Sequence, residues 1–245
     1  MEETTIDELL VKDNDKVGSA AYQAQGAEAT NRGLSQDVCD SITLACNILG
    51  PLYVSDPEHD ENVASIFQAI ASLDATAAGD EWPFANHGVA CSSIELMQQG
   101  INDGAPTQQT IWEFRRLFVG PNPMPAPPWG SVYTDKDEVV FGASTLELRQ
   151  WMRERGIKRL GDEKTPEDQL GLMLLLLSWL AQNKPELVFE YLQNHLLTWS
   201  SHFLKELEQS AEASFYTGLA RLTRSTLEGL QAYMGIDMQY PHYYR

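Results

Sequence analysis

The chain has 245 residues, 43% of them hydrophobic, which is enough to bury one large core, or one domain with an extension. Its 35 acidic and 17 basic residues give a net charge of −18, and this negative charge disfavours binding to the phosphate backbone of nucleic acids. Residues 1–110 hold 18 acidic and only 3 basic side chains, so they would attract a basic partner; the other interpretation is that the acidity only keeps the protein soluble.

Cysteine and hydropathy patterns favour a cytoplasmic protein. Cys39, Cys46 and Cys91 form no C-x-x-C pair and have no zinc-like spacing, which indicates reduced thiols and no metal site. The segment that begins at Met1 lacks the basic and apolar regions of a secretory signal. The longest apolar run, residues 170–180, is shorter than the ~20 residues that a membrane span requires. We therefore expect no stable membrane insertion, and no cofactor is indicated.

Residues 1–33 are rich in small and polar side chains. We predict a loosely ordered acidic extension there, with at most a short helix around residues 6–11. Residues 34–245 show apolar side chains at helical spacing, with no fixed-period repeat and no βαβ alternation. We predict a single all-α domain of about eight to nine helices, with a long proline-rich loop between two of them.

Caps and apolar spacing predict the first two helices. Ser35 is expected to cap a helix that ends at Gly50, and the second helix is expected to begin at residues 56–58 and to run through Ile70. Residues 74–92 are rich in Ala, Gly and Asp and give no clear assignment.

The next helices lead into the most unusual stretch of the chain. Residues 94–99 fit a short helix, and Thr107 is expected to cap a longer one that ends at Gly120. Five prolines then fall within residues 121–128, the proline segment, and Trp129 follows. Because proline fixes φ and lacks a backbone donor, this segment can be neither helix interior nor central strand. It is either a rigid connection packed on the core or a preformed ledge for an extended peptide.

Beyond the proline segment, residues 132–133 and 139–141 fit short extended pieces around a turn. Ser144 is expected to cap a helix over 145–155. Residues 165–168 have the hydroxyl, proline and acids of a compact helix start.

Three further helical features complete the chain. The helix after Asp168 is apolar nearly all round and should be the buried centre. Pro185 is expected to begin a helix with one apolar side that carries Val188, Leu192, His195, Leu196, Trp199 and Phe203. A last helix presents Phe215, Leu219, Leu222, Leu230 and Tyr233.

No recognised catalytic motif occurs in the sequence, which favours binding over turnover. His195 and His202 share one helix face without metal-binding spacing, and His195 is interpreted as a hydrogen-bonded core or groove residue. A hydrolase that uses Asp168 and His195 is conceivable, but no nucleophile is identifiable. Asp168 also has a purely structural interpretation, because it lies three residues after Thr165, where a carboxylate caps a helix.

Several motifs carry a resemblance to a known family. They are R-L-F-V-G-P at 116–121, P-P-W-G-S-V-Y at 127–133, F-G-x-S-T-L-x-L-R-Q-W-M-R at 141–153, P-E-D-Q at 166–169 and H-L-x-x-W-x-x-x-F at 195–203. With these motifs the chain, from about residue 35 onward, resembles the TorD/DmsD family of redox-enzyme maturation chaperones. It looks most similar to the branch that serves dimethyl-sulfoxide-reductase-type molybdoenzymes.

The resemblance implies an all-helical cytoplasmic protein without catalytic activity. Such proteins bind the twin-arginine leader of a reductase catalytic subunit and delay export of the precursor until the molybdopterin cofactor is inserted. Components of the twin-arginine translocase are further partners that the resemblance allows. The leader-binding residues of the family map here to Phe114, Leu117, Phe118, Pro128, Trp129, Asp168 and Gln169. His195 and Trp199 are candidates for the same groove.

Three positions depart from the family pattern. Phe114 stands where Trp is frequent, Gln169 where His is usual, and Thr198 where Pro usually precedes the Trp. Because Gln169 does not titrate, the resemblance gives no basis here for a pH-sensitive release at that position.

The chemistry of a leader agrees with this mapping. Two arginines followed by an apolar segment require acid beside an apolar groove, and Asp168 could bind a guanidinium bidentately. Leu117, Phe118 and Trp129 could bury the apolar part. The alternative is a structural adaptor that binds the mature part of a redox enzyme or a translocase component.

Overall fold

The computed structural model of the chain describes residues 34–158 and 165–245. Most of these residues are helical, which confirms the predicted all-α fold; β1 (Ile101–Asn102) and β2 (Ala105–Pro106), an antiparallel pair, form the only sheet in the described part. The predicted extension, with its short helix at 6–11, lies outside these residues. Within the described ranges, no helix is both long and apolar enough to cross a membrane.

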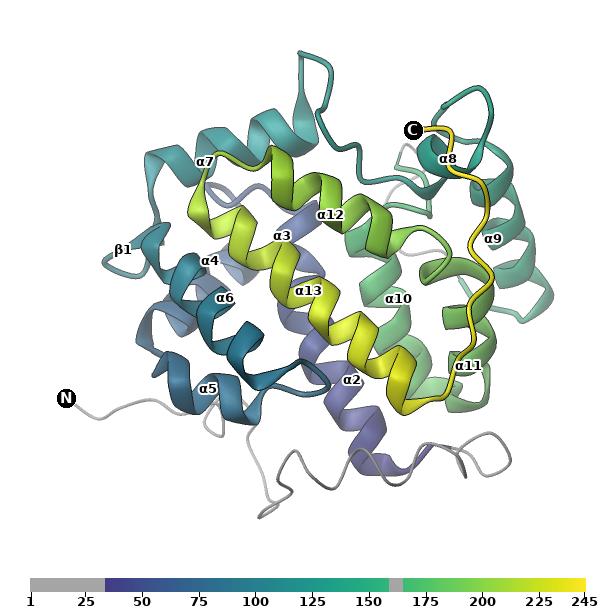
Figure 1. The fold of residues 1–245 in the computed structure, drawn as a ribbon, viewed down its shortest axis with the longest axis horizontal. Coiled ribbons are helices and arrows are strands. Elements are labelled where there is room, and N and C mark those ends of the chain that lie inside the picture. The colour runs from purple at the N-terminus through teal and green to yellow at the C-terminus, as the bar shows by residue number, and fades with distance from the viewer. Residues whose placement is uncertain (1–33, 159–164) are drawn as a thin grey trace.

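Two helices form the centre of the fold. α10 (Leu170–Asn183) packs on α2 (Gln36–Leu49), and α10 is buried around most of its circumference, as its sequence predicted. α13 (Ser214–Tyr233), the predicted last helix, crosses the molecule with α6 (His87–Gln99) on one side and α12 (Ser200–Ser210) on the other (Figure 1). The core is thus built by helices that bury their apolar faces on one another.

Gly171 lets α10 approach the short helix α3 (Pro51–Val54) closely. A Cβ on Gly171 would lie 2.5 Å from the carbonyl oxygen of Gly50 and 2.9 Å from Cβ of Tyr53, so a larger residue would push the helices apart. The close approach brings the carbonyl of Tyr53 within reach of the first residues of α10.

The second predicted helix begins later than expected. α4 (Glu61–Ser72) starts after Asp60 and not at residues 56–58. The reason is that Asp60 Oδ1 accepts the backbone N–H groups of Asn62 (2.9 Å) and Val63 (3.3 Å), which makes Asp60 the cap.

Residues 74–92, which the sequence left unassigned, contain α5 (Ala75–Glu81) and the first part of α6. The helix predicted at 94–99 is therefore only the end of α6. α5 packs so close to α6 that a Cβ on Gly79 would lie 2.7 Å from the backbone nitrogen of Cys91. Packing through small residues leaves little apolar periodicity to detect.

The helix before the proline segment is capped as predicted. The Thr107 hydroxyl accepts the backbone N–H of Thr110 (3.2 Å) at the start of α7 (Gln108–Phe114). The helix continues as a π-helical turn, Arg115–Val119, and ends at Gly120, whose φ of 98° suits glycine. The proline segment, every residue of which is described, contains neither helix nor strand.

The extended pieces predicted after the proline segment are absent from this described stretch. Residues 132–133 belong to α8 (Gly130–Thr134), and residues 139–141 lie in the loop that follows. Valine and tyrosine favour strands through side-chain packing, but here both side chains are buried on the helical core, and this tertiary contact decides the local conformation.

The next helix begins one residue before the predicted cap. α9 (Ala143–Glu154) has Gly142 at its N-cap position, and Ser144 lies inside the first turn. The start is fixed from outside the helix, because Asp135 Oδ2 accepts the Ala143 N–H (2.5 Å).

The helix start predicted at 165–168 is wrong. α10 begins at Leu170, four residues after the predicted first position, because the side-chain oxygen of Gln169 accepts the N–H of Leu172 (3.0 Å) and makes Gln169 the cap. The carboxylate of Asp168, the predicted cap, instead accepts the N–H of Ser131 (2.8 Å).

The continuous helix predicted from residue 185 to 203 is broken in two. The first part consists of a 3₁₀ turn (Pro185–Leu187), α11 (Val188–Tyr191) and a π-helical turn (Leu192–Leu196). α12 begins after Trp199, whose φ of −139° interrupts the helix.

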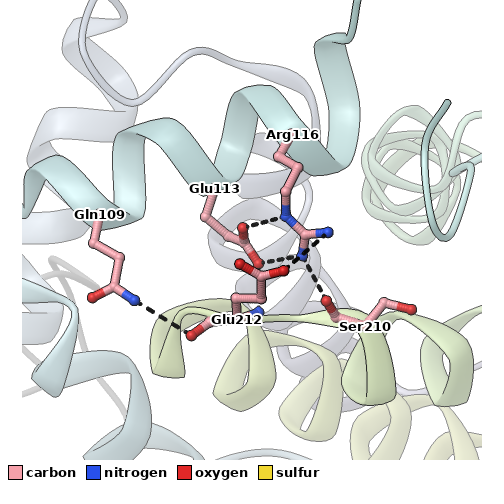
Figure 2. A network of polar contacts seen from close by, with 5 residues as sticks. All are labelled: Gln109, Glu113, Arg116, Ser210 and Glu212. Atoms are coloured by element: carbon pink, nitrogen blue, oxygen red, sulfur yellow. Dashed lines mark hydrogen bonds and ion pairs between the residues drawn. The ribbon is translucent and has the colours of Figure 1, made fainter. Parts of the chain in front are cut away.

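A partly buried ion pair, Glu113–Arg116, links α7 and its π-helical turn by hydrogen bonds to the end of α12 and the connection to α13 (Figure 2). The Glu113 carboxylate accepts two hydrogen bonds from Arg116 (2.7 and 2.8 Å) and one from the backbone N–H of Glu212 (2.6 Å). Arg116 also donates to the carbonyl of Ser210 (2.6 Å). Burial raises the pKa of Glu113, but these hydrogen bonds outweigh it and leave the pKa below the usual value.

We predict that Arg116→Met lowers the free energy of unfolding by about 2 kcal/mol, because it leaves the Glu113 carboxylate buried without its cation. Urea denaturation measures this change. The double variant Glu113→Gln/Arg116→Met should recover part of the loss, since it removes the unpaired charge. Arg115→Met is the matched control; its exposed pair with Glu58 should contribute less than about 1 kcal/mol. Equal losses for Arg115→Met and Arg116→Met would contradict the prediction.

Candidate functional site

Two of the motifs that are distant in sequence meet through their backbones. Trp129 and Gln169 form an antiparallel bridge. The N–H of Gly130 donates to the carbonyl of Asp168 (3.2 Å), and the N–H of Leu170 donates to the carbonyl of Pro128 (2.9 Å). The end of the proline segment is therefore fixed to the start of α10.

A third motif packs on this junction through Trp199. A Cβ on Gly130 would lie 2.7 Å from the indole nitrogen of Trp199, so only glycine allows this close contact. The Trp199 ring stacks on Tyr133, with ring centroids 6.0 Å apart and an interplanar angle of 13°. The Trp-Gly-Ser-Val-Tyr sequence at 129–133 thus forms the surface against which the indole of Trp199 is held.

Asp168 is a buried carboxylate at the centre of the junction, with 2% of its surface exposed. Its Oδ2 accepts the N–H of Ser131 (2.8 Å) and the hydroxyl of Ser144 (3.3 Å). Burial raises the pKa of Asp168, and hydrogen bonds from Ser131 and Thr145 offset this only in part. The interpretation of Asp168 as a helix-capping carboxylate is therefore wrong, because its partners lie on α8 and α9.

The neighbouring acid, Glu167, is neutralised within the protein. Arg149 on α9 donates to both of its oxygens (2.9 and 2.6 Å), in the bidentate geometry typical of strong arginine–carboxylate pairs. Only 5% of the Glu167 side chain is exposed, so the pair is a firm link between α9 and the segment before α10.

Gln169 is engaged at both ends of its amide. Its oxygen caps α10, and its nitrogen donates to the carbonyl of Tyr53 (2.9 Å). Gln169 therefore joins α10 to α3, and its amide is committed to the scaffold.

A pocket with a volume of about 260 Å³ opens beside Asp168. Its polar wall includes three carboxylates, Asp135, Glu147 and Asp168, and its lining contains no Lys or Arg among the described residues. The pKa of His195, a further lining residue, is lowered to about 4, chiefly by burial; Glu190 opposes this shift, and Arg155 contributes to it. His195 is thus neutral near pH 7, and the pocket is electronegative. The remaining lining residues are Thr134, Ala143, Ser144, Leu148, Met173, Asn194, Thr198, Trp199, Gln239 and Pro241.

The segment after α13, residues 237–245, closes one side of the pocket and reaches the proline segment. Tyr243 donates its hydroxyl to the carbonyl of Thr198 (2.7 Å), and Arg245 donates to the carbonyls of Met124 (3.2 Å) and Pro125 (3.0 Å). The proline segment is therefore held at both ends, by Arg245 and by the junction with α10.

Not all the predicted site residues meet in this pocket. Asp168, His195 and Trp199 line it, whereas Pro128, Trp129 and Gln169 form the junction behind Asp168. The other three predicted residues, Phe114, Leu117 and Phe118, are buried in the core.

One of these three buried residues, Phe118, is nevertheless connected through aromatic contacts to the junction between the proline segment and α10. Phe118 packs edge-on against Phe114 (5.5 Å between centroids) and Tyr53 (5.8 Å), and Tyr53 is the residue that holds Gln169. A leader-binding role for any of these residues stays a prediction.

Sequence reasoning missed two of the three acids in the pocket. Asp135 lies in the turn expected between residues 133 and 139, and Glu147 lies within the helix expected over 145–155, but neither was predicted as a site residue. Nothing in the sequence brings them together with Asp168, because their positions depend on α8 being helical and on the start of α9.

One acidic cluster away from the pocket has side chains close enough to share a cation. Asp56, Glu58 and His59 have ligand atoms within 4.8 Å of one another. Arg115, however, already pairs with both Asp56 and Glu58, so the carboxylates have a cation from the protein itself.

Comparison with known proteins adds relatives along most of the chain. A family described as nitrate reductase delta subunit matches residues 90–205. The chain is 43% identical over 212 residues to the probable Tat proofreading chaperone DmsD of Haemophilus influenzae, a match that covers 86% of this chain and 100% of that protein. It is 38% identical over 200 residues to the Tat proofreading chaperone DmsD of Salmonella paratyphi A, covering 81% of this chain and 93% of that protein. It is 28% identical over 195 residues to the chaperone protein YcdY of Escherichia coli, covering 78% and 94%.

These relatives are chaperones, which agrees with the resemblance that the motifs carry and with the expectation of a protein without enzymatic activity. A further match, to the chaperone protein TorD of Vibrio cholerae, covers a shorter part of the chain. The chain belongs to the TorD/DmsD family of redox-enzyme maturation chaperones.

Proposed function

We propose that the acidic pocket binds the arginine pair of a twin-arginine leader on a redox-enzyme precursor. The observation that carries the proposal is the set of three carboxylates around one cavity whose described lining contains no Lys or Arg. The names of the relatives, Tat proofreading chaperones, support the same class of partner.

Asp168 is the main anchor in this proposal. It is fixed by neutral donors, the Ser131 N–H and the Ser144 hydroxyl, so its charge is not compensated by either of these contacts. A guanidinium that enters the pocket supplies that compensation and forms charge-assisted hydrogen bonds in a site of low dielectric. Asp135 and Glu147, nearer the surface, are placed to attract the second arginine.

The remaining predicted residues have two roles in the proposal. Trp129 is half-buried beside Asp168, so the exposed part of its ring can contact the leader; its indole nitrogen is itself buried and has no hydrogen-bond partner among the described residues. Phe114, Leu117 and Phe118 act from the core: Phe118, packed on Phe114, supports Tyr53, whose carbonyl accepts the hydrogen bond from Gln169.

The finer expectations form part of the same proposal. The client is the precursor of a dimethyl-sulfoxide-reductase-type molybdoenzyme catalytic subunit, held in the cytoplasm until its cofactor is inserted and before export. The protein acts by binding and masking the leader, with no chemical step.

We predict that Asp168→Asn weakens the binding of a twin-arginine leader peptide at least tenfold, about 1.4 kcal/mol, because it removes the buried charge. Isothermal titration calorimetry measures the affinity. Asn keeps an oxygen for the Ser131 N–H, so the melting temperature should not fall markedly. Asp137→Asn is the matched control. Asp137 is an exposed acid in the loop after α8 and lies outside the pocket lining, so this variant should bind the peptide like the wild type.

Two outcomes would contradict this proposal. One is an equal affinity of wild type and Asp168→Asn for the peptide. The other is a precursor that stays bound to the wild type after its leader is deleted, which would favour the adaptor alternative.

We also predict that leader binding weakens on acidification from neutral pH, and that the loss begins at a higher pH than an ordinary aspartate would give. The raised pKa of Asp168 means that its carboxylate takes up a proton early on acidification, and a neutral acid no longer attracts arginine. Because arginine binds the charged form, the fraction of Asp168 that is protonated must lose its proton when the peptide binds. Calorimetry in buffers of different ionisation enthalpy detects this release.

The variants separate the titrating groups of the pocket. Asp168→Asn should flatten the pH profile, whereas His195→Gln should leave it unchanged above pH 5, because the pKa of His195 is about 4. A profile that stays steep in Asp168→Asn would assign the titration to another group.

A further inference from the structure

Four exposed apolar side chains lie on the loop and helix that form one wall of the pocket. The exposed fractions are 47% for Val139, 40% for Val140, 43% for Phe141 and 55% for Leu146. Together these residues are here called the apolar rim. Large apolar side chains that are exposed in a group indicate an interaction surface more often than isolated ones do.

The apolar rim is continuous with the pocket along the chain. Its first three residues lie between Asp135 and Ala143, both of which line the pocket, and Leu146 directly precedes Glu147, another lining residue. Asp135 also fixes this loop, since its carboxylate accepts the Ala143 N–H (2.5 Å). Because consecutive Cα atoms are ~3.8 Å apart, Phe141 lies within about 8 Å of Ala143.

Contacts within the rim hold its side chains in place. The guanidinium of Arg149 lies over the Phe141 ring, 5.8 Å from its centroid. Arg149 is itself fixed by Glu167, and it lies three residues after Leu146 on the same face of α9. Leu146 is thus presented by α9, and Phe141, in the loop before it, is held against α9 by Arg149, although both side chains are exposed.

We propose that the apolar rim binds the apolar stretch of the same peptide whose basic residues occupy the pocket. This inference rests on the proposed function. Its occupant is defined by chemistry: an extended segment with two basic residues and an apolar stretch within about four residues of them, since each extended residue spans ~3.3 Å. The negative charge of the pocket favours the basic residues of the peptide, and because the rim adjoins the pocket, the neighbouring apolar stretch can lie on the rim.

The test uses two fluorescent peptides with the same arginine pair, one with its apolar stretch and one in which serine and glycine replace that stretch. Fluorescence anisotropy measures their affinity for the wild type and for Phe141→Asn/Leu146→Gln. Asn tolerates the φ of 68° at position 141, and Gln is a good helix former, so the fold should persist, as circular dichroism can verify.

The double variant should bind the apolar peptide roughly tenfold more weakly than the wild type does, and should bind the polar peptide unchanged. Trp112→Gln is the matched control. Trp112 is 65% exposed on α7, outside the pocket lining, and its variant should bind both peptides like the wild type.

The other outcomes overturn the inference in distinguishable ways. If Asp168→Asn weakens both peptides while the rim variant weakens neither, the pocket proposal stands and the rim proposal falls. If the rim variant instead shifts only the oligomeric state in sedimentation, the rim is covered by a second copy of the chain. If the wild type binds neither peptide, both proposals fall.

Discussion

The site depends on the pairing of two short backbone stretches, residues 128–131 and 168–170. Their hydrogen bonds fix the end of the proline segment to the start of α10, the buried helix at the centre of the fold. A proline-rich segment offers few donors of its own, so it needs external contacts to adopt one position. The junction supplies them, and the close packing of Gly130 on the Trp199 indole adds a contact that larger residues would prevent. The pocket wall is thereby as rigid as the core behind it.

Two adjacent acids at this junction, Glu167 and Asp168, have different surroundings: one is paired with a cation of the protein, and the other, among the described residues, is not. Glu167 receives both hydrogen bonds that Arg149 donates, and the pair joins α9 to the scaffold. Asp168, one residue later, receives a backbone N–H and a hydroxyl, which orient the carboxylate without neutralising it. Burial of such a charge is unfavourable, and the raised pKa of Asp168 expresses this. If the pocket binds a cationic ligand, as we propose, the ligand compensates this buried charge, and the carboxylate is already held in position before the ligand arrives.

The sequence predicted those features that depend on local chemistry. The apolar circumference of α10 indicated a buried helix, Thr107 indicated a cap, and the motifs indicated the family; all three predictions are confirmed. The errors arose where a tertiary contact decides the outcome. Residues 132–133 have the composition of a strand and are helical because both side chains are buried. Asp168 has the sequence position of a helix-capping carboxylate, but in the fold its side chain accepts a hydrogen bond from the backbone N–H of Ser131. The three pocket acids come from separate segments that only the folded chain brings together.

A binding protein without turnover achieves selectivity through the combination of features that its ligand must carry. Carboxylates alone would attract any basic surface, and an exposed apolar rim alone would attract many unfolded chains. Requiring both within a few residues excludes most folded proteins, because a folded surface rarely exposes an apolar stretch beside paired arginines in extended conformation. An unfolded leader meets the requirement, and it no longer does so once it is sequestered elsewhere or removed. In the proposed binding mode, the juxtaposition of the pocket and the apolar rim would therefore let a small site discriminate a precursor from the finished enzyme.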